Sequence, residues 1–319
     1  MRAACPSRPP CHHLLPPSRT GPSSRAMLTL HGSIPALVTP FTEDARHVDE
    51  DAFAALVERQ VRGGSHGLVP VGTTGESPTL SEAEHVRVIG LCVEAARGRV
   101  PVIAGVGSNN TEAACRLARG AAAAGADALL ATTGYYNKPS QAGLIQHYEA
   151  LRRATDLPVV IYNVPGRTAS DVRVETLAAL SFMEGIVGVK DATGDLARVA
   201  RHRVSCKAGF VQLSGEDATA VGFNAMGGRG RISVAANVAP ERCASLQDAC
   251  ADGDWDAARD MQGQLIHLID ALFADTNPAP VKYALSRMGL CKEALRLPLV
   301  PASEGARRAV DAALEGLGR

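Results

Sequence analysis

The sequence predicts an α/β fold, a (β/α)8 TIM barrel with a C-terminal helical appendage. Short apolar runs recur eight times between residues 34 and 235, and a longer amphipathic segment follows each of them. Continuous apolar runs are typical of parallel strands that helices cover on both faces. Eight strands with eight crossover helices close into a barrel, whereas an open doubly wound sheet usually has fewer strands.

The expected strands are the apolar runs at residues 34–38, 67–71, 102–105, 128–131, 158–162, 186–189, 210–213 and 231–235. Ser81 and Glu84 have the spacing of a capping box, so we expect a helix to begin there. A doubly wound sheet would have a glycine fingerprint after its first strand. The nearest match, Gly105-Val-Gly107-Ser-Asn-Asn, follows the third run and lacks the third glycine, which argues against a dinucleotide site.

The chain divides into three parts. Residues 28–253 contain the apolar runs and form the expected barrel, and residues 254–319 show helical patterns without strands. Residues 1–27 are rich in Pro, Ser and Arg, contain no Asp or Glu, and have no hydrophobic period. We expect this first part to be a disordered extension, or a misassigned start with Met27 as the true initiator.

Composition excludes several function classes. The chain has 33 basic and 33 acidic side chains, so no positive surplus suggests a nucleic-acid partner. No apolar stretch approaches the roughly 18 residues of a membrane span. The eight cysteines form no Cys-x-x-Cys pair, which favours reduced thiols in a cytoplasmic protein. Cys11-His12-His13 has no second ligand cluster at zinc spacing, so we expect no metal site.

Active sites of barrels lie at the C-terminal ends of the strands, so the polar residues after each run are the candidates. Lys190 ends the sixth run, where a neutral amine can attack a carbonyl and form a Schiff base. An ion pair with Asp191 or Glu76 is an equally good interpretation. Tyr162 ends the neighbouring run and is suited to proton transfer, although a core tyrosine with a wet hydroxyl is common.

Two further groups could bind carboxylates. Thr73 and Thr74 lie between glycines, which let the backbone approach a ligand closely, although the same pattern is typical of a tight turn. Arg167 has the planar fork that binds a carboxylate, but a single loop arginine more often forms a surface salt bridge. No cluster of histidines or carboxylates suggests metal catalysis, and no Gly-x-Ser-x-Gly elbow suggests a serine hydrolase.

These residues lie in motifs that resemble a known superfamily. Gly-Leu-Val-Pro-Val-Gly-Thr-Thr-Gly-Glu at residues 67–76 is similar to the first signature of the dihydrodipicolinate synthase and N-acetylneuraminate lyase superfamily. Tyr-Asn-Val-Pro-Gly-Arg-Thr at residues 162–168, with Gly-Val-Lys190 downstream, is similar to the second. The resemblance runs from about residue 32 to the C-terminus and includes Asn-Pro-Ala-Pro-Val-Lys at residues 277–282.

The resemblance implies that Lys190 binds pyruvate as an imine without a cofactor. It also implies a proton relay in which Tyr136 reaches into a partner subunit's site. Within the superfamily, Tyr136 and Arg167 point to the dihydrodipicolinate synthase branch, which condenses pyruvate with L-aspartate 4-semialdehyde in diaminopimelate and lysine biosynthesis. A cytoplasmic homotetramer, a dimer of dimers, is then expected. The implied roles are relay for Thr74, Tyr162 and Tyr136, pyruvate carboxylate binding for Thr73 and Thr74, backbone contacts for Gly215 and Ile232, and binding of the second substrate's carboxylate for Arg167.

The chain departs from the usual pattern at two positions. Gly134 replaces the proline usual before the tyrosine pair, and Arg231, which we expect beside the pocket, replaces an apolar residue. Two other functions remain as alternatives. A neuraminate or 2-keto-3-deoxy sugar acid lyase would share Lys190 and Tyr162 but differ around Arg167. A catalytically silent keto-acid sensor would tend to lose one of the site residues.

Feedback by L-lysine is expected to be weak or absent. By resemblance, lysine-sensitive relatives bind L-lysine near the second-strand loop, at positions that match Ser77, His85, Asn109 and Tyr135 here. Where they have a glutamate that pairs with the ligand's amino group, this chain has Ala113. Two nearby carboxylates, Glu82 and Glu112, are candidates to replace it.

Overall fold

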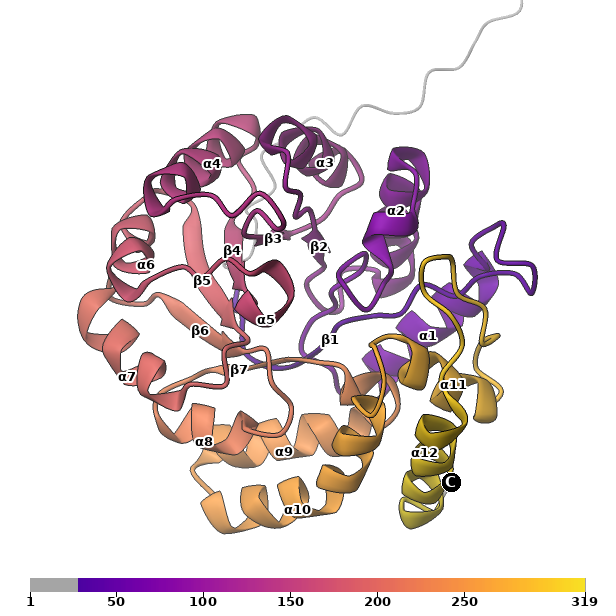
Figure 1. Cartoon of the computed structure of the whole chain (residues 1–319). Helices are drawn as coiled ribbons and strands as arrows, with labels where there is room; N and C mark the ends of the chain where they lie inside the picture. Colours follow the sequence, from indigo (N-terminus) through magenta and orange to yellow (C-terminus); the bar gives the residue numbers. More distant parts are fainter. Residues whose placement is uncertain (1–27, 319) are drawn as a thin grey trace, which may run out of the picture.

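The computed structural model describes residues 28–318, which form a closed parallel barrel surrounded by helices (Figure 1). The sheet has the order β1-β7-β6-β5-β4-β3-β2, and every pairing is parallel. The strands are β1 (Gly32–Pro35), β2 (Ile103–Gly105), β3 (Ala128–Thr132), β4 (Val159–Asn163), β5 (Ile186–Asp191), β6 (Val211–Ser214) and β7 (Gly230–Ser233).

The expected strand at residues 67–71 closes the barrel but is not a regular strand. It pairs in parallel on both sides through single bridges, Ala36 with Val69 and Leu68 with Val102. Val69 N donates to Pro35 O at 2.9 Å, and Ile103 N donates to Leu68 O at 2.8 Å. Prolines at positions 35, 70 and 101 lack an N–H group, so the ladders on either side of this segment are interrupted.

One helix follows each strand and packs outside the barrel (Figure 1). The capping box predicted at the start of α2 is confirmed, because the Ser81 side chain accepts from Glu84 N and the Glu84 side chain accepts from Ser81 N. The barrel helices are α1 (Glu50–Arg62), α2 (Glu82–Ala96), α3 (Thr111–Ala123), α4 (Gln141–Ala154), α6 (Val174–Ser181), α7 (Leu196–Ser205), α8 (Ala220–Ala225) and α9 (Pro240–Asp252). Short turns of helix, η1 (Ser77–Thr79), α5 (Pro165–Thr168) and η2 (Ala235–Asn237), lie in the loops.

The core confirms that the strands are buried on both faces. Ile34, Ile103, Val160 and Ile232 belong to a cluster inside the barrel. A second cluster, which includes Leu129, lies between the strands and the surrounding helices. Alternate residues of each strand therefore fill different layers, as the continuous apolar runs predicted.

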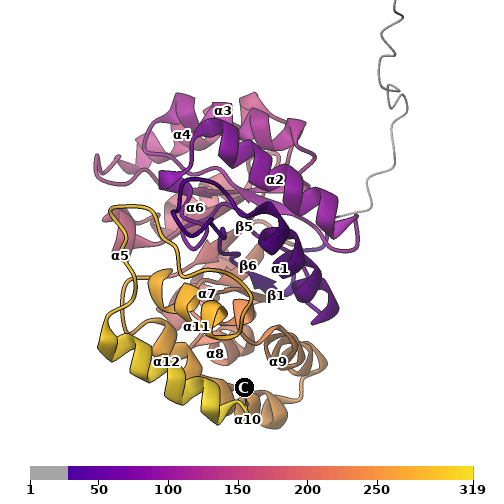
Figure 2. The ribbon, with the colours of Figure 1, turned by 90° about the vertical axis from the view of Figure 1, so that its right-hand side faces the viewer.

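The predicted C-terminal appendage consists of α10 (Trp255–Leu272), α11 (Ala279–Arg287) and α12 (Glu304–Gly316). Figure 2 shows these helices on one side of the molecule, where α10 packs against α9, and α12 packs against α10 and α11. Within residues 28–318, no helix is long and apolar enough to cross a membrane. The six cysteines in this part of the chain are free thiols. The expectations for residues 1–27, including the Cys11-His12-His13 segment, lie outside the described residues.

Candidate active site

Lys190 and Tyr162 lie side by side at the C-terminal ends of neighbouring strands. They are register partners in the β4–β5 pairing, and both are buried, with exposed fractions of 6% and 7%. The Lys190 Nζ atom lies 4.0 Å from the centre of the Tyr162 ring. The structure thus brings a buried amine and a phenol together at the barrel mouth, which is the catalytic end of such folds.

The two carboxylates considered as partners of Lys190 are paired with other cations. Asp191 Oδ2 accepts from Arg198 Nε at 3.0 Å. Glu76 Oε1 lies 2.5 Å from Lys282 Nζ. Among residues 28–318, no ion pair or hydrogen bond of the Lys190 amine is found. The ion-paired interpretation of Lys190 is therefore wrong, and its side chain lines a small cavity at the barrel mouth instead.

The loop at residues 72–76 brings Thr73 and Thr74 to the same cavity. Thr74 is buried and Thr73 is half-buried. The residues at the two ends of the loop have left-handed backbones, with φ of 49° at Val71 and 54° at Glu76. Such conformations cost about 1–3 kcal/mol each in residues other than glycine, and they persist where the surrounding contacts hold them. Left-handed residues are also typical of tight turns, so this backbone fits both interpretations of the segment.

Arg167 and Glu216 bring opposite charges to this cavity. Arg167 lies on α5, is exposed, and forms no ion pair with any residue in the described part of the chain. The surface salt bridge considered for it is therefore wrong. Burial, and then the neighbouring Asp217, raise the pKa of Glu216, whereas Lys190 and Arg167 act in the opposite direction. The cavity can thus offer a cation to a carboxylate ligand.

Gly215 and Ile232 also line the cavity. A Cβ atom on Gly215 would lie 2.5 Å from the Cβ of Ala192, so a larger residue does not fit there.

The expectation that Arg231 lies beside the pocket is wrong. Side chains of adjacent strand residues point to opposite faces, and the fully buried Arg231 pairs with Asp217 at 3.4 Å while lining neither cavity at the barrel mouth.

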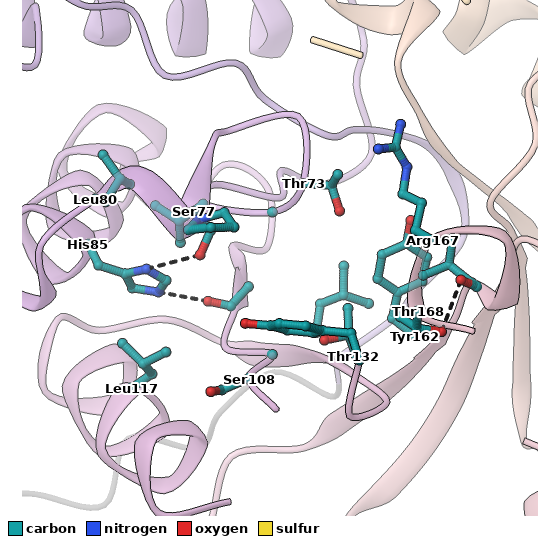
Figure 3. Close-up of a pocket in the computed structure, with 18 of the residues that line it drawn as sticks. Thr73, Ser77, Leu80, His85, Ser108, Leu117, Thr132, Tyr162, Arg167 and Thr168 are labelled. Atoms are coloured by element: carbon teal, nitrogen blue, oxygen red, sulfur yellow. Dashed lines mark hydrogen bonds between the residues drawn. The ribbon is translucent and has the colours of Figure 1, made fainter. Parts of the chain in front are cut away.

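Two adjoining cavities share Thr73, Tyr162 and Arg167 in their walls. The smaller, of about 60 Å³, contains Lys190. The larger, of about 400 Å³, extends to His85 and the start of α2. Figure 3 shows Tyr162 and Arg167 at one end of this larger cavity and His85 at the other. A second substrate in the larger cavity would therefore lie next to a small substrate bound at the Lys190 amine.

Tyr136 points away from the site of its own chain. Its side chain is 90% exposed, its backbone φ is 70°, and it lines neither cavity. The preceding Tyr135 lines the larger cavity. Gly134 is buried, and a Cβ atom there would lie 3.2 Å from Pro139 Cγ. The protomer therefore assembles the predicted lysine, tyrosine and threonines but not Tyr136.

The two carboxylates that were candidates to replace the glutamate at Ala113 are already engaged. Glu82 pairs with Arg116 at 2.8 Å. Glu112 pairs with Arg119 at 3.1 Å. Both pairs are exposed to solvent, so each contributes little stability. In each pair the arginine nevertheless balances the negative charge of the glutamate. This arrangement leaves neither glutamate as an uncompensated charge for a ligand's ammonium group.

The model of the dihydrodipicolinate synthetase family matches residues 29–317. The chain belongs to this family. Among its family relatives, the 4-hydroxy-tetrahydrodipicolinate synthase of Parvibaculum lavamentivorans is 57% identical over 287 residues, which cover 90% of this chain and 98% of the relative. The enzyme of the same name from Rhizobium meliloti is 56% identical over 289 residues, again covering 90% and 98%.

Solved structures of the synthetase family have the same fold. The chloride-inhibited dihydrodipicolinate synthase from Acinetobacter baumannii, complexed with pyruvate, is 42% identical, with a TM-score of 0.89 and coverage of 91% of this chain and 99% of that one. The enzyme from Cyanidioschyzon merolae with lysine bound is 34% identical, with a TM-score of 0.88 and coverage of 90% and 98%. The chain is accordingly a lyase of the class I aldolase type, with the 4-hydroxy-tetrahydrodipicolinate synthase activity of the lysine and diaminopimelate pathway.

Three residues of the site were not predicted from the sequence. Asn277 and Glu216 line the small cavity, and Lys282 pairs with Glu76 at the end of the loop at residues 72–76. Asn277 and Lys282 lie in the Asn-Pro-Ala-Pro-Val-Lys segment, but no strand precedes that segment, so the strand-end rule does not indicate them. Glu216 follows β6 by two residues, and the same rule stopped at Gly215.

Proposed function

We propose that the chain condenses pyruvate with L-aspartate 4-semialdehyde through a Schiff base on Lys190. The observation that carries the proposal is the buried Lys190 amine, which has no ion-pair partner in the described structure and lies over the ring of Tyr162. The neutral form of a lysine amine is the nucleophile that attacks a carbonyl and forms a Schiff base. A phenol on the neighbouring strand is suited to proton transfer during imine formation.

The chemistry follows from the groups at the barrel mouth. The Lys190 amine attacks the ketone carbon of pyruvate, and the resulting carbinolamine loses water to give the imine. Loss of a proton from the methyl carbon gives an enamine, whose carbon then attacks the aldehyde of the second substrate. Each of these steps moves a proton, and we assign the relay to Tyr162, Thr74 and a partner subunit's Tyr136. Thr73 and Thr74 hold the pyruvate carboxylate with hydroxyl and backbone donors.

Substrate choice rests on Arg167. Its guanidinium has no ion-pair partner in the described residues and lines both cavities. A planar, unpaired guanidinium matches the carboxylate of L-aspartate 4-semialdehyde. We assign backbone contacts with the substrates to Gly215 and Ile232, which line the small cavity. This arrangement favours the synthase over a sugar acid lyase, for which we expect a different residue in place of Arg167.

A homotetramer, built as a dimer of dimers in the cytoplasm, completes the proposal. The support for a partner copy is Tyr136, a 90% exposed aromatic residue on a loop with a left-handed backbone. The number of copies and the cytoplasmic location come from the family resemblance. A tyrosine held outward in this way cannot serve the site of its own protomer. A second copy that receives it would complete the relay at both sites.

Borohydride reduction in the presence of pyruvate tests the mechanism. Reduction traps the imine, so mass spectrometry should find a stable adduct on Lys190 and none without pyruvate. The buried Lys282 is the internal control, because its amine is engaged by Glu76 and should remain unmodified. An adduct on another lysine, or no adduct, would overturn the mechanism.

A coupled assay separates the candidate functions. Pyruvate with L-aspartate 4-semialdehyde should support turnover, without added metal or nucleotide. Turnover only with a sugar acid would favour the lyase alternative, and adduct formation without turnover of any aldehyde would favour a keto-acid sensor. Loss of activity on treatment with EDTA would contradict a mechanism that uses protein groups alone.

A further inference from the structure

Asn277 lies between α10 and α11 of the C-terminal appendage and reaches the loop at residues 72–76. Its side chain is 5% exposed and lines the small cavity that contains Lys190. The Asn277 Nδ2 atom donates a hydrogen bond to Thr74 Oγ1 at 3.0 Å. Its other side-chain atom, Oδ1, is buried and has no hydrogen-bond partner within residues 28–318. Within residues 28–318, the bond to Thr74 is thus the one hydrogen bond found for the Asn277 side chain.

The direction of this bond decides what the Thr74 hydroxyl can do. A hydroxyl has one proton to donate and two lone pairs that accept. Because Thr74 Oγ1 accepts from Asn277, its own proton stays available for another acceptor. No other side-chain hydrogen bond of Thr74 is found in the described structure. The proton can therefore be directed into the cavity, toward Tyr162 or a bound substrate.

Neighbouring contacts fix the asparagine against the loop. Five residues further on, Lys282 pairs with Glu76 at 2.5 Å, and neither side chain is exposed to solvent. Glu76 Oε2 also accepts from the backbone N of Arg296 at 3.1 Å. From the barrel side, Thr39 Oγ1 donates to Gly75 O at 2.7 Å. The loop that contains Thr74 is thus held from two directions, and the relative position of the asparagine and the threonine is set.

We propose that Asn277 is a positioning residue that orients the Thr74 hydroxyl for proton transfer. The inference rests on the proposed function, since it assigns Thr74 to the relay. Asn277 acts through Thr74, and its own amide does not take part in bond making. An aspartate at this position would reverse the bond, because a carboxylate only accepts. Thr74 would then donate its proton to position 277, away from the relay.

A double-mutant cycle tests the inference. Asn277→Asp should lower kcat roughly 10- to 100-fold, the loss expected when a reacting group is misdirected. KM for pyruvate and borohydride trapping on Lys190 should change little. In a Thr74→Val background the same substitution should change kcat by less than about twofold, because the two residues act as a unit. Asn277→Ala should be milder than Asn277→Asp, since it leaves the Thr74 hydroxyl free to turn.

A structural role predicts the opposite order, because aspartate matches asparagine in size and alanine does not. Equal losses from Asn277→Asp in both backgrounds, or no loss in either, would overturn the inference. Asn224→Asp is the matched control: that buried amide donates to Gln247 on α9, outside both cavities, and its kcat should not change. If Asn277→Asp does not fold, Asn277→Ser takes its place in the cycle. Its loss of kcat should likewise be present in the wild-type background and absent in the Thr74→Val background. Failure of the wild-type chain to trap pyruvate would instead refute the proposed function.

Discussion

Replacing Lys282 by methionine should strongly destabilise the protein. The Lys282–Glu76 pair is completely buried, with the Nζ and Oε1 atoms 2.5 Å apart. Lys282 Nζ also donates to Ala294 O at 2.7 Å and lies 4.1 Å from the centre of the Phe41 ring. Methionine keeps most of the side-chain volume but removes the charge. The Glu76 carboxylate would then remain buried with a backbone N–H as its donor.

The expected loss follows from the uncompensated carboxylate. Removing one partner of a buried ion pair typically costs about 3–5 kcal/mol. With an unfolding entropy of about 2.1 cal/mol/K per residue, a chain of 319 residues loses about 1.5 °C of Tm per kcal/mol, so Tm should fall by roughly 4–8 °C. Differential scanning calorimetry of the wild-type and Lys282→Met proteins at equal concentration measures the shift. Neutralising both partners, in Glu76→Gln with Lys282→Met, should recover most of it, because no charge is then left unpaired.

An exposed lysine in the same segment provides the control. Lys292→Met makes the same chemical change at an exposed position and should shift Tm by about 1 °C or less. A Lys282→Met shift as small as that of the control would refute the reasoning. So would a double variant less stable than Lys282→Met alone, since the penalty would then not arise from the stranded carboxylate.

Three further outcomes can be measured. Burial lowers the pKa of His85, His147 and His202 below the ordinary 6.5. The unfolded chain therefore binds protons near pH 6 that the folded chain does not. The urea concentration at the unfolding midpoint should decrease when the pH is lowered from about 7.5 to about 5.5, and a constant midpoint would contradict this. Tyr136→Phe should cut turnover about 100-fold at unchanged Tm, and mixing it with Lys190→Ala subunits should restore part of the activity. No recovery in confirmed mixed oligomers would show that each site is built within one chain. Titration of L-lysine against initial rate should show weak inhibition. Half-inhibition below about 1 mM would contradict the inference that the ligand's amino group has lost its carboxylate partner.

The strand pattern made the barrel predictable, and its exception has a chemical cause. Apolar runs of four or five residues located every strand, because parallel strands in a barrel have no polar face. The run at residues 67–71 was correctly placed in the barrel wall. Its hydrophobicity did not predict that it would pair with its neighbours through single bridges instead of a regular ladder. Proline interrupts the ladders around it, and the local backbone turns left-handed at Val71.

The site was predictable as far as the strand-end rule extends. Lys190, Tyr162 and the threonine pair follow apolar runs, and the fold brings them to one cavity. Whether Lys190 is paired could not be decided from spacing, because its possible partner Glu76 is engaged by a residue 206 positions further along the chain, Lys282. Contacts at such separation leave no periodic signal in the sequence.

The division of the chain at residue 253 separates the strands from the appendage, but it does not separate the site from the appendage. Asn277 donates to Thr74, and Lys282 holds Glu76. Arg296 adds a bidentate contact with Glu84 at the start of α2, which lowers the pKa of that carboxyl to about 2.

Lys282 and Arg296 lie over the same ring, that of Phe41, so a single aromatic side chain packs against both cations. The acidic partners of both cations, Glu76 and Glu84, belong to the barrel. Charges on the barrel are therefore balanced by charges on the appendage, across an interface that includes the loop at residues 72–76. A barrel without these helices would leave Glu76 without its cation, and Thr74 would lose the hydrogen bond from the Asn277 amide. The appendage thus forms part of the wall of the candidate site, although every strand of the fold precedes it.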